Sequence, residues 1–255
     1  MRVSAPRPAR RLARSDDDVV ISIVLLHSGV TDSGEWDAVR PVLEHEHPVF
    51  TPELPGFGST PEVAGELSLA DYVGSTFDGP AALVGTSFGG RAVLETALAA
   101  PERVTHLVLV DANPFGWSDE VQRVQSREEE LFDGDRFDEA AELMVRSWLV
   151  GPEREPVEVD SELQERVKRM VLRSYELQAG VESSLRRVQI EPARISAPTL
   201  VIRGGLDWPE VAVAAHRFVE EMPNAHEVVV DGCAHLPTME RPDEVARLIL
   251  DFLSR

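Results

Sequence analysis

The chain has 255 residues, 43% of them hydrophobic and 27% charged, and a formal net charge of −20. This length and hydrophobic content predict one soluble globular domain with a sizeable core and room for an insertion. The acidic balance argues against nucleic acid and anionic membranes as partners, because both would repel the chain. No apolar run approaches the roughly 18 residues of a membrane span. A single cysteine, Cys233, forms no intrachain disulfide, which fits a cytoplasmic location.

The first 18 residues form a basic arm that ends in three aspartates. Its five arginines include the pair Arg10 and Arg11, and Asp16, Asp17 and Asp18 follow. One hypothesis is an export signal, with the twin arginines ahead of the apolar stretch 19–26. The aspartates and the lack of a small-residue cleavage site favour the other hypothesis, a mobile, solvated arm over residues 1–18.

Short apolar runs rich in β-branched residues predict strands buried on both faces, as in a parallel sheet covered by helices. They occupy residues 19–26, 49–51, 81–84, 104–110, 199–202 and 227–230. Helical periodicity falls between them, at about 35–46, 68–77, 88–100, 209–222 and 240–254. The alternation predicts βαβ units and an α/β fold with a doubly wound sheet.

The alternation stops between residues 112 and 195, where only helical patterns are found. They cover residues 118–132, 137–150, 161–179 and 182–188. We expect this segment to be a helical lid over the carboxyl edge of the sheet, where open α/β sheets bind ligands. The predicted organisation is therefore an arm (1–18), a core (19–111 and 196–255) and a lid (112–195).

The strongest chemical signal is a Gly-x-Ser-x-Gly motif centred on Ser87, between a predicted strand and a predicted helix. At a helix N-terminus the serine lies beside free N–H groups, so Ser87 is the candidate nucleophile and the Phe88 N–H a candidate oxyanion donor. An ordinary turn with a capping serine is the simpler alternative. A phosphate-binding loop is a third, but Arg91 and Ala92 replace the lysine and hydroxyl residue that such a loop needs.

A nucleophilic serine needs a base and a group that orients the base. Asp207 and His235 each follow the carboxyl end of a predicted strand, which brings them to the edge that carries Ser87. His235 is the expected base and Asp207 its orienting acid. Asp111 also ends a strand and competes with Asp207 for that role. The alternatives are a packed loop histidine and a turn aspartate.

A second oxyanion donor is expected in the loop after the first strong strand. Residues His27, Ser28, Gly29 and Val30 occupy it. Gly29 is the first choice for the backbone donor and Val30 the second, while His27 is expected to be structural. A simple turn is the alternative.

These motifs resemble the α/β-hydrolase fold superfamily, in its branch of small lidded serine esterases, enol-lactone hydrolases, cofactor-free haloperoxidases and carbon–carbon bond hydrolases. The resemblance covers residues 19–110 and 197–255 and includes Asp32, Trp36 and the run 53–59. It implies a mostly parallel sheet with the lid after the sixth strand, and a Ser, Asp, His triad in that chain order. Ser28, Glu53 and Thr86 depart from the usual glycine, aspartate and histidine, and the leading hairpin is expected to be shortened or absent.

The resemblance and the motifs together predict a serine hydrolase that cleaves a small carboxylic ester or lactone through an acyl-enzyme. Two alternatives are a carbon–carbon bond hydrolase or lyase acting on a small diketone, and a non-catalytic ligand-binding relative. Neither metal nor cofactor is expected, and the partner is a small-molecule substrate of a monomer or homodimer. The pocket candidates are Val30, Trp36, Phe115, Trp117, Trp148, Trp208 and Leu236.

Overall fold

A six-stranded parallel sheet forms the centre of the protein in the computed structural model, which describes residues 21–255. The strand order is β2-β1-β4-β5-β7-β8, and every neighbouring pair is parallel. The strands are β1 (Ser22–Leu26), β2 (Val49–Phe50), β4 (Ala81–Thr86), β5 (Val104–Val110), β7 (Thr199–Gly204) and β8 (Ala225–Val230). The predicted α/β class is confirmed. The predicted arm and any leading hairpin lie outside the described residues.

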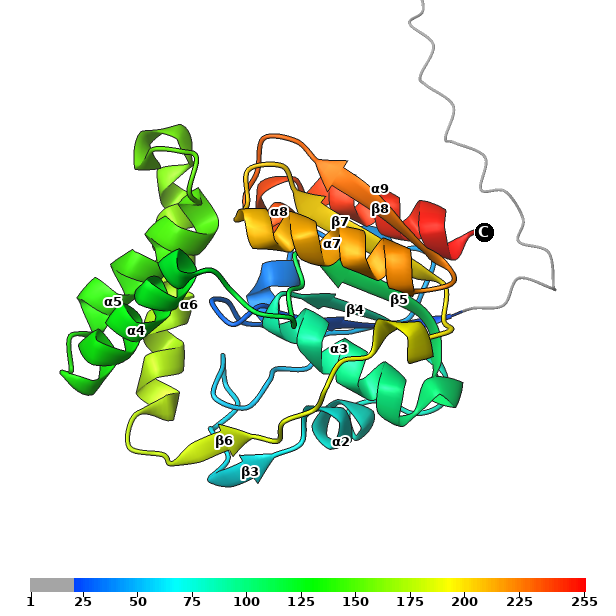
Figure 1. Cartoon of the computed structure of the whole chain (residues 1–255), viewed down its shortest axis with the longest axis horizontal. Coiled ribbons are helices and arrows are strands. Elements are labelled where there is room, and N and C mark those ends of the chain that lie inside the picture. The colour runs from blue at the N-terminus through cyan, green and yellow to red at the C-terminus, as the bar shows by residue number, and fades with distance from the viewer. Residues whose placement is uncertain (1–20) are drawn as a thin grey trace, which may run out of the picture.

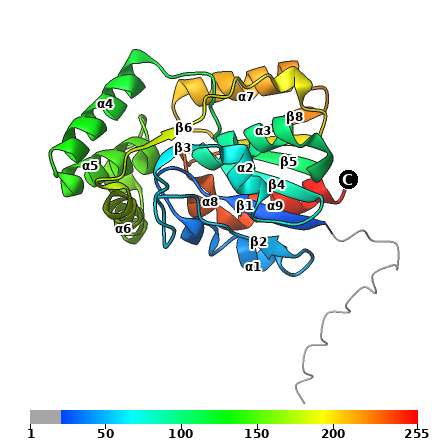
Figure 2. The ribbon, with the colours of Figure 1, turned by 90° about the horizontal axis from the view of Figure 1, so that it is seen from below.

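Helices cover both faces of the sheet (Figure 2). α1 (Arg40–Leu43) and α9 (Pro242–Leu253) pack on one face, and α2 (Leu69–Gly74), α3 (Phe88–Ala99) and α7 (Pro209–Glu221) pack on the other. Alternate strand residues enter the two cores: Val24 and Leu26 join the α3 side, whereas Ile23 and Leu25 join the α9 side. Both faces of the strand are buried, which is why its sequence is continuously apolar.

The lid segment, residues 112–195, leaves the sheet after β5 and returns at β7 (Figure 1). It contains α4 (Asp119–Asp133), α5 (Phe137–Met144), the π-helical η3 (Val145–Val150) and α6 (Ser161–Gln178). Among the described residues no strand precedes β1, so the lid follows the fourth strand of the sheet in chain order rather than a sixth. Each helix that the structure describes in residues 21–255 is too short or too polar to span a bilayer.

Three predicted helices differ from the structure. The helix predicted over 35–46 is a short turn, η1 (Ser33–Trp36), and then α1, because Pro41 fits only the first turn of a helix. The helix predicted over 240–254 is split into α8 (Pro237–Glu240) and α9 by Pro242. The helix predicted over 182–188 is wrong: β6 (Ser183–Leu185) pairs in parallel with β3 (Gly65–Leu67) instead.

Candidate active site

Ser87 lies at a sharp turn between β4 and α3. Its backbone has φ 51° and ψ −107°, a strained conformation for a residue that is not glycine, and its N–H donates to the Val110 carbonyl (2.8 Å). The chain crosses itself so closely here that a Cβ on Gly85 would overlap with the Gly89 backbone, and one on Gly89 with the Leu26 carbonyl. The glycines therefore allow the turn that raises Ser87 above the sheet.

Ser87, His235 and Asp207 form one continuous set of hydrogen bonds. His235 Nδ1 lies 2.6 Å from Asp207 Oδ2, and its Nε2 lies 2.8 Å from Ser87 Oγ. A carboxylate only accepts, so the imidazole proton is on Nδ1 and Nε2 accepts from the serine hydroxyl. The ring of His235 and the carboxyl group of Asp207 are buried. The arrangement suits proton removal from Ser87 by His235, with Asp207 holding the tautomer.

Asp111, the competing acid, lies against this set from the end of β5. Its Oδ1 accepts from the Gly204 N–H (2.9 Å), whereas its Oδ2 is buried and faces no hydrogen-bond donor. Burial, reinforced by the neighbouring Asp207 carboxylate, raises the pKa of Asp111 well above the ordinary aspartate value. His235 Nδ1 meets Asp207 Oδ2, and none of the hydrogen bonds among residues 21–255 joins His235 to Asp111, so the geometry makes Asp207 the acid that orients the base.

The loop after β1 lies beside the N-terminus of α3. The Gly89 N–H donates to the His27 carbonyl (3.1 Å), and a Cβ on Gly29 would be in van der Waals contact with the Phe88 side chain. Phe88 begins α3, so its N–H has no partner one helical turn earlier. The Val30 N–H already points to Ser28 Oγ (3.3 Å), which favours Gly29 as the second oxyanion donor.

His27 has a structural role beneath this loop. Its Nε2 accepts from the Leu54 N–H (3.0 Å), which requires a neutral ring with the proton on Nδ1. Nδ1 then donates to the Ser28 carbonyl (2.7 Å). Both nitrogens are used, so the ring holds the loop and has no nitrogen free for catalysis.

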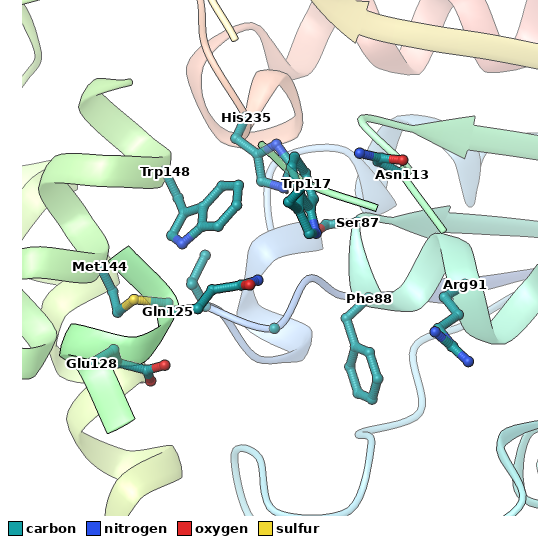
Figure 3. A pocket seen from close by; sticks show the side chains of 12 residues that line it. Ser87, Phe88, Arg91, Asn113, Trp117, Gln125, Glu128, Met144, Trp148 and His235 are labelled. Atoms are coloured by element: carbon teal, nitrogen blue, oxygen red, sulfur yellow. The ribbon is translucent and has the colours of Figure 1, made fainter. Parts of the chain in front are cut away.

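A cavity of about 260 Å³ opens above Ser87, between the core and the lid (Figure 3). Lid side chains form one side and the residues around α3 the other. Its lining is Gly29, Val30, Ser87, Phe88, Arg91, Asn113, Trp117, Gln125, Glu128, Met144, Trp148 and His235. The Trp148 ring lies 4.6 Å from the His235 ring, centroid to centroid, so the indole covers the base and limits access of water.

Four of the predicted pocket residues do not line this cavity, whereas Val30, Trp117 and Trp148 do. Trp36 and Leu236 are fully buried in the hydrophobic core clusters. Phe115 packs on Phe218 of α7, with ring centroids 5.1 Å apart. Trp208 is buried behind Trp148 and donates its indole N–H to the Ser147 carbonyl (3.0 Å). Position beside a catalytic loop did not determine which way these side chains point.

Several lining residues from the lid were not predicted from the sequence. Gln125 and Glu128 of α4 and Met144 of α5 all face the cavity. Val121, Gln125 and Glu128 are spaced by four and three residues, so they share one face of α4. Val121 is fully buried, and that helical spacing was the signal that could have placed the two polar residues toward the core.

One group within residues 21–255 has the composition of a metal site: Asp111, Asp207 and His235 place donor atoms within 4.8 Å of one another. Apart from Asp111 Oδ2, the side-chain atoms that would bind a metal here are engaged in hydrogen bonds. His235 Nδ1 donates to Asp207, and Asp111 Oδ1 accepts from Gly204. The set is better explained as a hydrogen-bonded acid–base group than as a ligand cage.

Comparisons with known proteins identify the family of the chain. A family model described as "Alpha/beta hydrolase family" matches residues 23–248. The chain is 26% identical over 243 residues to a pimeloyl-[acyl-carrier protein] methyl ester esterase of Aeromonas hydrophila, covering 91% of this chain and 94% of that protein. A protein of the same description from Nitrosomonas europaea is 28% identical over 244 residues, covering 87% and 91%.

Solved structures share the fold at lower identity. The enol-lactonase from Burkholderia xenovorans superposes with a TM-score of 0.73 at 19% identity, covering 94% of both chains. A thermophilic esterase from Thermogutta terrifontis superposes with a TM-score of 0.68 at 24% identity, covering 92% of this chain and 89% of the other. These similarities establish the arrangement of strands and helices.

Proposed function

Because the chain belongs to the alpha/beta hydrolase family, we propose that it is a carboxylic ester hydrolase that cleaves a small ester or lactone through an acyl-enzyme on Ser87. The observation that carries the proposal is the unbroken hydrogen bonding from Asp207 through His235 to Ser87 Oγ. The esterase names of the two relatives support ester hydrolysis as the reaction class.

The proposed reaction has two halves. Ser87 Oγ attacks the carbonyl carbon while His235 Nε2 takes its proton, and the Phe88 and Gly29 N–H groups stabilise the oxyanion. The tetrahedral intermediate collapses, and His235 gives the proton to the departing alkoxide, which leaves an acyl-Ser87 ester. Water, activated by His235, then attacks this ester and releases the carboxylic acid and free Ser87.

The cavity supports a small substrate of low charge. Trp117, Trp148 and Met144 offer apolar surface, and Gln125 and Glu128 add polar groups at the lid side. Residues 119–142 carry ten acidic and three basic side chains, so this part of the lid repels highly anionic substrates. The proposal includes a monomer or homodimer in the cytoplasm that acts on a small molecule without a cofactor.

The test compares wild type with Ser87→Ala on a panel of p-nitrophenyl esters, lactones and diketones. We expect short-chain ester or lactone turnover in wild type and a loss of at least about 10³-fold in the variant, because the nucleophile is missing. Equal ester turnover in the two proteins would overturn the proposal. Consumption of a diketone alone, without any ester or lactone hydrolysis, would also contradict it.

A further inference from the structure

Glu35 is a buried carboxylate beside the active site that the proposed reaction does not use. It lies in the η1 turn with only 2% of its surface exposed. Within residues 21–255 no basic side chain forms an ion pair with it. Burying a carboxylate is unfavourable unless its oxygens are hydrogen-bonded, so its bonding partners show what the residue holds in place.

The first oxygen of Glu35 organises the loop that contains Gly29. Oε2 accepts from the Ser28 N–H (2.8 Å) and from Thr31 Oγ1 (2.6 Å). Ser28 Oγ in turn lies 2.9 Å from Thr31 Oγ1 and accepts from the Val30 N–H. The loop is therefore folded around this carboxylate, and the fixed Ser28 amide is one residue from the Gly29 amide.

The second oxygen reaches the segment that follows the catalytic base. Oε1 accepts from Thr238 Oγ1 (2.8 Å), a residue of α8 that lies three positions after His235. Thr238 is fully buried, so this hydrogen bond has no water to replace it. One carboxylate thus joins two segments that are far apart in sequence, and each segment supplies one part of the catalytic group.

We propose that Glu35 is a positioning residue that fixes the Gly29 oxyanion donor and the His235 base relative to each other. The inference rests on the proposed function, because it assumes that Gly29 and His235 act on the same carbonyl. Glu35 is not among the residues that line the cavity, and it acts through the loop amide and Thr238. Its removal therefore weakens contacts that strengthen in the transition state, while the cavity that binds the ground state keeps its lining.

The experiment measures kcat and KM for a p-nitrophenyl ester with Glu35→Ala and Glu35→Gln. We expect kcat of Glu35→Ala to fall about 10- to 100-fold with KM within about twofold, because a misplaced oxyanion donor costs rate rather than ground-state binding. Binding of a trifluoromethyl ketone, which forms a tetrahedral adduct with the serine, should weaken by a similar factor. Glu35→Gln keeps an acceptor for the loop amide and should restore part of kcat.

Two further variants, each lacking one hydrogen bond to Glu35, test the proposal even if Glu35→Ala does not fold. Thr31→Val removes the loop contact and Thr238→Val removes the contact to α8, and each should lower kcat by several-fold. Glu44→Ala, which removes an exposed carboxylate that pairs with Arg40, is the matched control and should retain wild-type kinetics. Circular dichroism and thermal unfolding establish that each variant is folded.

Wild-type kcat in folded Glu35→Ala, or in both threonine variants, would overturn the inference. A rise in KM at unchanged kcat would do so as well, because it would make Glu35 a support of the pocket wall. If Ser87→Ala is as active as wild type, the proposed function itself fails. If Ser87→Ala is inactive while every Glu35 variant is fully active, only the positioning role fails.

Discussion

The carboxyl edge of the sheet and the lid above it are held by different kinds of contact. At the edge, backbone hydrogen bonds and close glycine crossings place Ser87, and the strand ends of β7 and β8 place Asp207 and His235. The lid is joined to that edge by one backbone hydrogen bond, from the His235 N–H to the Trp148 carbonyl, and by side chains: Arg154 pairs with Glu240, and Trp148 packs on His235. The chemistry therefore depends on backbone register, whereas substrate fit depends on side-chain packing.

The largest expected effect tests the edge of the sheet. Asp207→Asn should lower kcat by about 10⁴-fold, because the asparagine favours the wrong histidine tautomer. Asp111→Asn should stay within about tenfold of wild type, because burial raises the pKa of Asp111 and asparagine resembles the neutral acid. Steady-state ester hydrolysis measures both. A greater loss of kcat in Asp111→Asn than in Asp207→Asn would show that Asp111, and not Asp207, is the acid that orients His235.

The next largest effect tests the junction between lid and core. Arg154 and Glu240 are both nearly buried, and Arg154 also donates to the Leu149 and Val150 carbonyls. Arg154→Met leaves Glu240 buried without its cation, so the free energy of unfolding should fall by about 3–5 kcal/mol in urea titrations. The control Arg127→Met breaks the exposed pair with Glu130 and should cost about 0–1 kcal/mol. Equal costs for the two variants would show that the junction is not a buried pair.

A pH-dependent difference in stability tests the neutral state of Asp111. The unfolded chain releases this proton near the ordinary value of 3.8, while burial raises the pKa of Asp111 in the native state. The native state binds the extra proton between these two values, so the contribution of Asp111 to the free energy of unfolding falls as pH rises. The free energy of unfolding of Asp111→Asn, relative to that of wild type, should therefore rise by up to about 1.4 kcal/mol per pH unit above pH 4. Urea unfolding at pH 5 and 7 measures this gain, and a constant difference would contradict it.

The smallest expected effect tests the lid as the wall of the cavity. Met144 lines the cavity, so Met144→Ala enlarges it and should shift the preference in kcat/KM toward a longer acyl chain by about tenfold. Leu131→Ala is the matched control, because Leu131 is buried in the same lid cluster without lining the cavity. It should lower stability and leave the chain-length preference unchanged. A shift of preference in both variants would indicate general loosening of the lid.

The same contrast explains what could be predicted from the sequence. Polar residues that directly follow parallel strands must meet at one edge, which is why Ser87, Asp207 and His235 could be chosen from their positions in the chain. The proposed role of Glu35 could not be predicted, because its two sets of partners, Ser28 with Thr31 and Thr238, lie far apart in sequence. The β3–β6 pair was missed for a similar reason: both strands have three residues and are largely exposed, so neither carries a hydrophobic pattern.

The residues that line the cavity were the hardest part of the site to predict from the sequence. Trp36, beside a predicted site loop, and Trp148, within the predicted lid, are both pocket candidates, yet Trp36 is buried in the core on the α9 side of the sheet and Trp148 faces His235. Trp148 lies in the π-helical turn η3, and its carbonyl accepts from the His235 N–H (3.2 Å). Both depend on tertiary packing that short-range periodicity does not encode.

The most direct test of the central claim is to trap the acyl group during turnover. Wild type is mixed with a p-nitrophenyl ester, quenched in acid within the first turnovers, digested and analysed by mass spectrometry. We predict one acyl group per chain, on the peptide that contains Ser87, and none in Ser87→Ala. An acyl group on another residue, or undiminished ester turnover in Ser87→Ala, would contradict the proposed acyl-enzyme.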